Sequence, residues 1–257
     1  MQIMLTNDDG IYAPGLAAME RALAKLGNVS VVAPAVEQSG VGHSITFLSP
    51  LMAKEVFDGP RRRGWAVEGS PADCVKLGLA KFCPQTPDLL VSGINGGLNV
   101  GINVLYSGTV AAASEAALYE IPSIAVSLEY DEHAQFDVAA EIATGIIEQM
   151  LARKAFHGHR LYNLNIPTTA TTGPAELKVV PMGLARWPAD FEERRDPKGR
   201  RYYWASGTPP TEMPGPDTDL VAIQNGHVTL TPLSLDRTIH KLLPAMREWN
   251  LTLPSRE

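Results

Sequence analysis

The sequence predicts an α/β protein with a doubly wound, mostly parallel sheet and an extended C-terminal arm. Two observations predict this fold. Short apolar runs alternate with amphipathic helical segments from residue 1 to residue 167, which is the order of consecutive βαβ units. From residue 168 onward the apolar runs are short, and Pro, Gly, Thr, Arg and Trp dominate. We therefore expect a core over residues 1–167 and an arm of β-hairpins and a helix over residues 168–257.

The first βαβ unit is expected within residues 1–32. A buried strand over residues 3–5 ends at the sequence Asn7-Asp8-Asp9-Gly10. Leucines and a methionine then recur at helical spacing over residues 16–26, and Gly27 is expected to end that helix. Residues 29–32 form the second strand. The loop after the first strand does not have the sequence G-x-G-x-x-G, which disfavours NAD binding.

The remaining elements of the core follow from the same patterns. Residues 48–57 and 64–68 are expected to pair as strands, with Arg61, Arg62 and Arg63 in a solvated turn between them. Ser70 is expected to cap a helix that reaches about residue 82, with Pro at its first position and Asp73 three residues after the cap. Further strands are expected at residues 87–91, 123–128 and 161–166, and further helices at 109–119 and 137–153.

The arm contains short strand-like pieces and one helical stretch. The pieces are residues 177–180, 202–205 and 228–232. Apolar side chains recur at roughly helical spacing over residues 236–249: Ile239, Leu242, Leu243, Met246 and Trp249. Because this pattern is too short for a separate core, the apolar face of the arm must be buried on another surface.

Composition excludes several classes of protein. The formal charge of −6 provides no basic surface for nucleic acid, so no nucleic-acid partner is expected. No run of 18 apolar residues and no basic leader segment is seen, so we expect no membrane span or signal peptide and a cytoplasmic location. Cys74 and Cys83 are the only cysteines, too few for a disulfide scaffold or a four-ligand zinc site.

The adjacent acids Asp8 and Asp9 are the first candidate site. They follow a buried strand, and ligands of open α/β sheets bind at the carboxyl ends of the strands. Their oxygens suit Mg²⁺ or Mn²⁺. Asn-Asp-Asp-Gly is also a common solvated turn, and on this stretch alone the two interpretations stay open.

Two further loops follow predicted strands and carry oxygen ligands. Residues 35–46 contain Ser39 and His43, each of which has an alternative interpretation as an ordinary turn or structural residue. The Gly- and Asn-rich loop over residues 92–108 contains Asn95 and leads into a helix at Ser107-Gly108-Thr109, where backbone N–H groups and the helix dipole favour a phosphate. A larger side chain at Gly108 is expected to crowd this phosphate and to affect metal affinity much less.

None of these loop segments contains Lys or Arg, namely residues 6–15, 36–46 and 92–116. The charge of a bound phosphate would therefore be met mainly by a metal ion and by backbone N–H groups. Activity is accordingly expected to depend strictly on the metal.

Five motifs in order resemble the SurE family, the survival-protein 5′-nucleotidases. They are LTNDDGIYAPG, QSGVGHSIT, GWAVEGSPADCVKLGL, PDLLVSGINGGLNVG and YSGTVAAASEAAL, within residues 1–128. The resemblance implies a Rossmann-like core and a metal-dependent phosphatase acting on nucleoside monophosphates. It implies one divalent ion per subunit, Mg²⁺ or Mn²⁺. Its metal ligands match Asp8, Asp9, Ser39 and Asn95, and its phosphate-contacting segment matches Ser107, Gly108 and Thr109, beside Asn95.

The reaction expected from this resemblance is phosphomonoester hydrolysis, with Asp8 or Asp9 as the catalytic proton acceptor. His43 would assist the leaving group or have a structural role. A non-catalytic metal- and nucleotide-binding sensor is the alternative. The base, the choice between 5′- and 3′-monophosphates, and polyphosphate hydrolysis stay open. The resemblance also suggests that the arm reaches a neighbouring subunit in a homodimer or homotetramer, the alternative being that it folds back on its own core.

Overall fold

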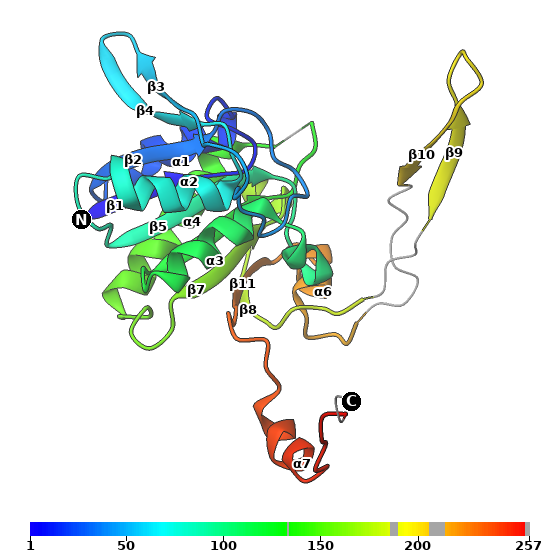
Figure 1. Ribbon diagram of the computed structural model, residues 1–257. Helices are drawn as coiled ribbons and strands as arrows, with labels where there is room; N and C mark the ends of the chain where they lie inside the picture. Colours follow the sequence, from blue (N-terminus) through cyan, green and yellow to red (C-terminus); the bar gives the residue numbers. More distant parts are fainter. Residues whose placement is uncertain (133, 186–189, 206–213, 255–257) are drawn as a thin grey trace.

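In the computed structural model, which describes residues 1–132, 134–185, 190–205 and 214–254, one large sheet runs through the molecule (Figure 1). Its strands are β1 (Gln2–Thr6), β2 (Asn28–Pro34), β3 (Ala53–Asp58), β4 (Arg61–Val67), β5 (Leu89–Gly96), β6 (Ser123–Leu128), β7 (Leu161–Ile166), β8 (Leu177–Val179) and β11 (Val228–Pro232). They lie in the order β3-β4-β2-β1-β5-β6-β7-β11-β8. The six strands from β4 to β7 in this order are mutually parallel, which confirms the predicted mostly parallel sheet.

Helices cover both faces of this sheet. α1 (Pro14–Leu23) and α4 (Phe136–Ala152) pack against each other on one face, over a core that includes Leu5, Leu16 and Ile147. α2 (Pro71–Leu77) and α3 (Gly108–Leu118) pack together over a second core that includes Met4 and Val75. Side chains of β1 therefore alternate between two apolar layers, as a central strand buried on both faces requires. The doubly wound α/β fold is confirmed.

The strand order reverses at β1, and this places the site. β2 lies on one side of β1 and β5 on the other, each parallel to it. The segments that follow β1, β2 and β5 therefore leave the sheet at one edge and around one crevice. In open α/β sheets this reversal point is where ligands bind.

Strand β5 is longer than the sequence predicts, and the predicted loop is correspondingly shorter. β5 continues through Gly96, and residues Gly101–Leu105 form a 3₁₀ helix before α3. The reason lies in Gly93, where a Cβ atom would lie 2.3 Å from the carbonyl oxygen of Val126 on β6. This glycine permits close approach of two strands, which a sequence reading cannot distinguish from loop flexibility.

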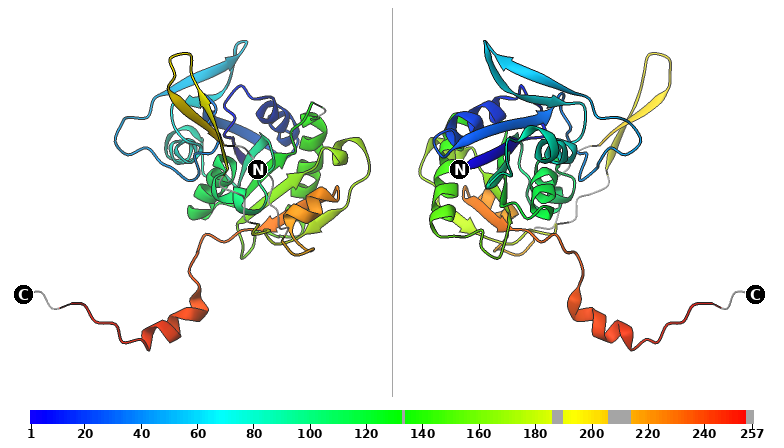
Figure 2. Two further views of the ribbon diagram at one scale, coloured as in Figure 1. Left: turned by 90° about the vertical axis from the view of Figure 1, so that its right-hand side faces the viewer. Right: turned by 60° about the vertical axis from the view of Figure 1, so that its left-hand side comes forward.

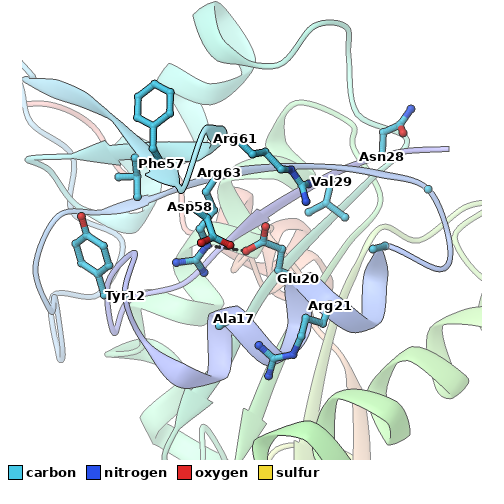
Figure 3. Close-up of a pocket in the computed structure, with 13 residues that line it drawn as sticks. Tyr12, Ala17, Glu20, Arg21, Asn28, Val29, Phe57, Asp58, Arg61 and Arg63 are labelled. Carbon is cyan, nitrogen blue, oxygen red and sulfur yellow. Dashed lines mark hydrogen bonds and ion pairs between the residues drawn. The ribbon is translucent and has the colours of Figure 1, made fainter.

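The predicted turn at the three arginines is wrong, and only Arg61 and Arg62 are surface charges as predicted. Residues Arg61–Val67 form β4, paired with β3, so all three arginines lie in a strand. The side chain of Arg63 is only 14% exposed. It donates to Glu20 of α1 at 2.7 Å and to the carbonyl oxygen of Ile11 at 2.8 Å. Figure 3 shows this pair in a cleft of about 880 Å³ between α1 and the β3–β4 hairpin, with Tyr12 and Phe57 also in its lining.

Gly27 does not end the first helix as predicted. α1 ends at Leu23, and turns follow before β2. A Cβ atom on Gly27 would lie 2.1 Å from the carbonyl oxygen of Met1, so this glycine allows the chain to pass beside the N-terminus. The predicted cap of the next helix is confirmed, because Ser70 accepts from the N–H of Asp73 at 3.1 Å and Asp73 accepts from the N–H of Ser70 at 2.9 Å.

The sheet does not end at residue 167. β11 pairs antiparallel with β7 and parallel with β8, and α5 (Thr169–Thr172) and α6 (Asp219–Gln224) lie between these strands in the chain. Two other parts extend away from the sheet in Figures 1 and 2: the hairpin of β9 (Phe191–Arg195) and β10 (Arg201–Ala205), and the C-terminal segment with α7 (Leu243–Arg247).

The helix predicted for residues 236–249 is much shorter than expected. Only a 3₁₀ turn, His240–Leu242, and α7 are helical. Pro244 accounts for part of the difference, because proline lacks an N–H and its ring clashes with the preceding turn in a helix interior, so it fits only in the first turn, where it lies in α7. Within the described residues, no helix has the length and apolar character to cross a membrane.

Candidate functional site

Asp8 joins the acidic turn to the start of α3. It directly follows the buried end of β1 and is 4% exposed. The hydroxyl of Thr109, itself fully buried, donates to Oδ1 of Asp8 at 2.6 Å. Burial raises the pKa of Asp8 from 3.8 to about 6, against the opposing effect of the Thr109 hydrogen bond, and the charge of Asp9 raises it further. Asp8 is thus a desolvated carboxylate within hydrogen-bond reach of the predicted phosphate segment.

Asp9 connects the same turn to β5. Its Oδ2 accepts from the backbone N–H of Gly96 at 3.1 Å. Burial raises the pKa of Asp9, the Gly96 hydrogen bond opposes this, and the charge of Glu37 adds to the increase. Asp9 therefore faces two segments of the chain: the end of β5, which contains Gly96, and the loop after β2, which contains Glu37.

The turn that presents the two acids is held by its own backbone and by Asn7. The side chain of Asn7 donates to the carbonyl oxygen of Gly10 at 3.0 Å and accepts from its N–H at 3.2 Å. Gly10 has a φ of +102°, a conformation in which L side chains are strained. The turn is thus an ordered support for two carboxylates, as the turn interpretation of this sequence predicts.

Ser39 lies in the loop after β2, which is anchored on both sides of it. The N–H of Gln38 donates to the carbonyl oxygen of Asp8 at 2.8 Å, and the N–H of Gly42 donates to that of Tyr106 at 2.9 Å. The Ser39 hydroxyl itself donates to Glu37 at 2.6 Å. The structure therefore places the backbone next to Ser39 in contact with Asp8. The Ser39 hydroxyl itself is hydrogen-bonded to Glu37 of the same loop.

Asn95 lies within β5 and next to Gly96, the residue that hydrogen-bonds Asp9. Its amide nitrogen donates to the carbonyl oxygen of Gly97 at 2.7 Å. The hydrogen bond orients the side-chain amide and leaves its oxygen and its second N–H available. The register of β5 against β6 shifts between Ser92 and Asn95, which changes the direction of the strand just before this residue.

Ser107, Gly108 and Thr109 form the predicted start of α3. Ser107 is the N-cap and accepts from the N–H of Val110 at 3.1 Å. A Cβ atom on Gly108 would lie 2.8 Å from the Cβ atom of Asp8 and 3.1 Å from its Oδ2. A side chain at Gly108 would therefore press on Asp8 as well as on a phosphate, so we expect it to affect metal affinity more than the sequence suggests.

The donor set fits a hard divalent cation. Asp8, Asp9, Ser39 and Asn95 provide oxygen atoms from three neighbouring segments. Within the described residues, no Lys, Arg or His forms an ion pair with either acid. This agrees with the raised pKa values of both acids. Among the described residues, no group of three His, Cys, Asp or Glu side chains is placed to hold a metal. A site with only two carboxylates, one hydroxyl and one amide would leave coordination positions for water or substrate.

His43 contacts α3 rather than the acidic turn. Its Nε2 lies 2.7 Å from a carboxylate oxygen of Glu115, whose other oxygen accepts from Lys76 of α2 at 3.2 Å. The His43 hydrogen bond holds the pKa of Glu115 below its usual range, with Lys76 contributing and burial opposing. Glu115 is seven residues beyond Gly108, about 10 Å along the helix. This distance favours a structural role for His43, which fastens the loop that carries Ser39.

Sequence reasoning missed several residues that build the site. Glu37 and the N–H of Gly96 contact the predicted ligands, and Asn99 supports the loop before α3. Asn99 donates to Ser127 at 2.8 Å, and its carbonyl oxygen accepts from Asn163 of β7 at 2.8 Å. The signal for the last contact was present, because two asparagines, Asn163 and Asn165, interrupt a buried strand and need polar partners.

The site is distinct from the cleft in Figure 3. That cleft lies along α1, and neither the acids nor the residues at the start of α3 line it. The charges in its lining include Glu20 and Arg63, which neutralise each other. The chemistry that the fold supports is therefore at the carboxyl edge of β1, β2 and β5.

Comparisons with known proteins agree with this geometry. The family model described as survival protein SurE matches residues 3–189. A curated protein of Rhodopirellula baltica named 5′-nucleotidase SurE is 54% identical over 98% of this chain and 99% of its own length. One of the same name from Desulforudis audaxviator is 41% identical over 97% of each chain. The crystal structure of the SurE protein from Aquifex aeolicus superposes with a TM-score of 0.83 at 36% identity, over 97% of this chain and 99% of that one. By these measures, the chain is a member of the survival protein SurE family.

Proposed function

We propose that this protein is a divalent-metal-dependent phosphatase that hydrolyses nucleoside monophosphates to nucleoside and phosphate, a 5′-nucleotidase. The observation that carries the proposal is the 2.6 Å hydrogen bond from Thr109 to Asp8, which joins a carboxylate turn to a helix N-terminus. A phosphate at that N-terminus meets free N–H groups on one side and carboxylate oxygens suited to a cation on the other. The 5′-nucleotidase names of full-length relatives support the same reaction class.

Asp8, Asp9, Ser39 and Asn95 would hold one Mg²⁺ or Mn²⁺ ion per subunit. When bound, the ion neutralises phosphate charge and makes water acidic enough to serve as a nucleophile near neutral pH. Asn95, Ser107, Gly108 and Thr109 bind the phosphate, the last three through the first turn of α3. The hydroxyl of Thr109 keeps Asp8 oriented while the phosphate is in place.

Asp8 and Asp9 are also the proposed catalytic residues. A carboxylate that accepts the proton of the attacking water must lie within hydrogen-bond reach of it. The raised pKa values of the two acids describe the metal-free protein, because a bound cation favours the ionised form of its ligands. Asp9 is the better candidate for this role, because Asp8 is more deeply buried and already accepts from Thr109.

The test is phosphate release from a panel of nucleoside monophosphates by protein stripped with EDTA and then supplied with Mg²⁺ or Mn²⁺. We expect no turnover in EDTA and full turnover after either ion is restored. Saturable nucleotide binding without phosphate release at any metal concentration would contradict the proposal and indicate a sensor. The same panel, extended to 3′-monophosphates and polyphosphate, would define the substrate range.

We also infer that the protein is a homodimer or homotetramer, a cytoplasmic one as the sequence predicts. The C-terminal segment supports this inference. It extends from the sheet in Figure 2 and exposes Ile239, Leu242 and Trp249 to 56%, 47% and 59%. A monomer rarely exposes such a run of apolar side chains, and exchange of an element between protomers would bury it.

A further inference from the structure

Tyr130 lies at the carboxyl edge of the sheet, beside Asp9. It follows the last residue of β6, Leu128, by two positions, and Leu128 is paired with Gly96 of β5. The Cδ2 and Cε2 atoms of its ring lie 3.3 and 3.8 Å from the position that a Cβ atom on Gly96 would occupy. Since the N–H of Gly96 donates to Asp9, the ring rests on the backbone that holds a carboxylate of the site.

The ring is supported on one edge and open elsewhere. Phe136, at the start of α4, lies beside it with ring centroids 6.5 Å apart and planes tilted by 37°. Phe136 also packs toward Gly15 of α1 and toward Gly96, so it forms a fixed base. Tyr130 is nevertheless 68% exposed. A positioned aromatic ring with an open surface is suited to stacking a planar, neutral group.

The two acids of the turn separate this ring from the phosphate segment. Asp8 faces Thr109 and Gly108 on α3, whereas Asp9 faces Gly96, on which Tyr130 rests. A monophosphate bound at the start of α3 can therefore extend its organic part past Asp9 toward the ring.

We propose that Tyr130 binds the nucleoside of the substrate by stacking against its base, and so determines the preference for nucleotides over other phosphomonoesters. This inference rests on the proposed function. The base is the planar part of the substrate, and it requires no charge from the protein. Gly96 contributes by having no side chain, because a Cβ atom there would displace the ring.

Tyr106 is the competing ring. It is 58% exposed and precedes Ser107, and its carbonyl oxygen accepts from Gly42. It lies directly beside the phosphate segment, whereas Tyr130 lies on the other side of the acidic turn. The experiment therefore includes both tyrosines.

The experiment measures kcat and KM for AMP and for ribose 5-phosphate, a phosphomonoester without a base. For Tyr130→Ala we expect the KM for AMP to rise about tenfold, from the loss of one stacking contact, with kcat within about twofold of wild type. The KM for ribose 5-phosphate should not change. Tyr130→Phe keeps the ring and should behave as wild type. Tyr203→Ala is the control, because Tyr203 is an exposed residue of β10, in the hairpin that extends away from the sheet.

An unchanged KM for AMP in Tyr130→Ala overturns the inference. So does an equal rise for both substrates, or a base-dependent rise in Tyr106→Ala alone. These results are distinct from failure of the proposed function, in which the wild-type protein releases no phosphate from AMP.

Discussion

Replacing Asp8 by Asn should stabilise the metal-free protein while abolishing its activity. Asp8 is buried, and its pKa is about 6 in the folded chain against an ordinary value of 3.8. Because the Asp8 carboxyl group holds its proton more tightly in the folded state than in the unfolded state, ionisation of Asp8 destabilises the fold. The penalty is absent below about pH 4, grows as the pH rises toward about 6, and is constant above that. The difference between the two pKa values corresponds to about 3 kcal/mol of unfolding free energy. Asn has no charge and avoids this penalty at every pH.

The assay is urea unfolding in EDTA of wild type and Asp8→Asn, at several values between about pH 4.5 and about pH 8. We expect the variant to be more stable at the upper end, by up to about 3 kcal/mol, with the difference shrinking as the pH falls. Asp217→Asn, the same substitution at an exposed position, is the control. Saturating Mg²⁺ should stabilise wild type much more than Asp8→Asn. A variant that is less stable than wild type at all pH values in EDTA would refute this account of Asp8.

The remaining predictions concern the turn, the start of α3 and the C-terminus. Asp9→Asn should lower turnover by at least about 10²-fold with an unchanged circular dichroism spectrum. If this variant kept near wild-type turnover at saturating metal, the acidic turn would have only a structural role. Gly108→Ala should weaken Mg²⁺ binding measured by calorimetry and destabilise the fold by about 1–3 kcal/mol, because its Cβ would press on Asp8. Gly145→Ala is the matched control in α4, where a Cβ meets nothing within 4 Å, so a gain of up to about 1 kcal/mol is expected there. Removal of residues 236–257 should shift the protein to a smaller species in light scattering, and a full-length chain that is already monomeric at about micromolar concentration would contradict subunit exchange.

The parts of the fold that could be predicted are those set by local pattern. β1, β6 and β7 are short, mostly apolar segments, and α4 has apolar side chains at helical spacing, so their positions follow from the pattern of burial. The chemistry at the strand ends follows in turn, because parallel strands deliver their following loops to one edge. Asp8 and the start of α3 could therefore be expected near each other before any contact between them was known.

The parts that could not be predicted depend on contacts between distant segments. Gly27 and Gly93 are needed for close approach to Met1 and Val126, and the sequence around each resembles a helix end or a loop. Arg63 resembles surface charge because its partner, Glu20, is 43 residues away. The same is true of Glu37, whose effect on Asp9 exists only when the loop after β2 folds across the acidic turn.

The two acids of the turn are buried or half-buried but have no cationic partner among the described residues. Among the described residues, Asp8 and Asp9 have hydrogen-bond donors in Thr109 and Gly96 but no cationic partner, and their pKa values are raised accordingly. A Lys or Arg at this edge would stabilise the empty fold and compete with a divalent ion for the same oxygens. Without one, the apo protein is less stable than it would be with a neutral turn, and the binding of a cation removes that deficit. Metal affinity and the low stability of the metal-free protein are then two consequences of one arrangement. The Asp8→Asn substitution should therefore raise the stability of the metal-free protein and destroy its metal affinity.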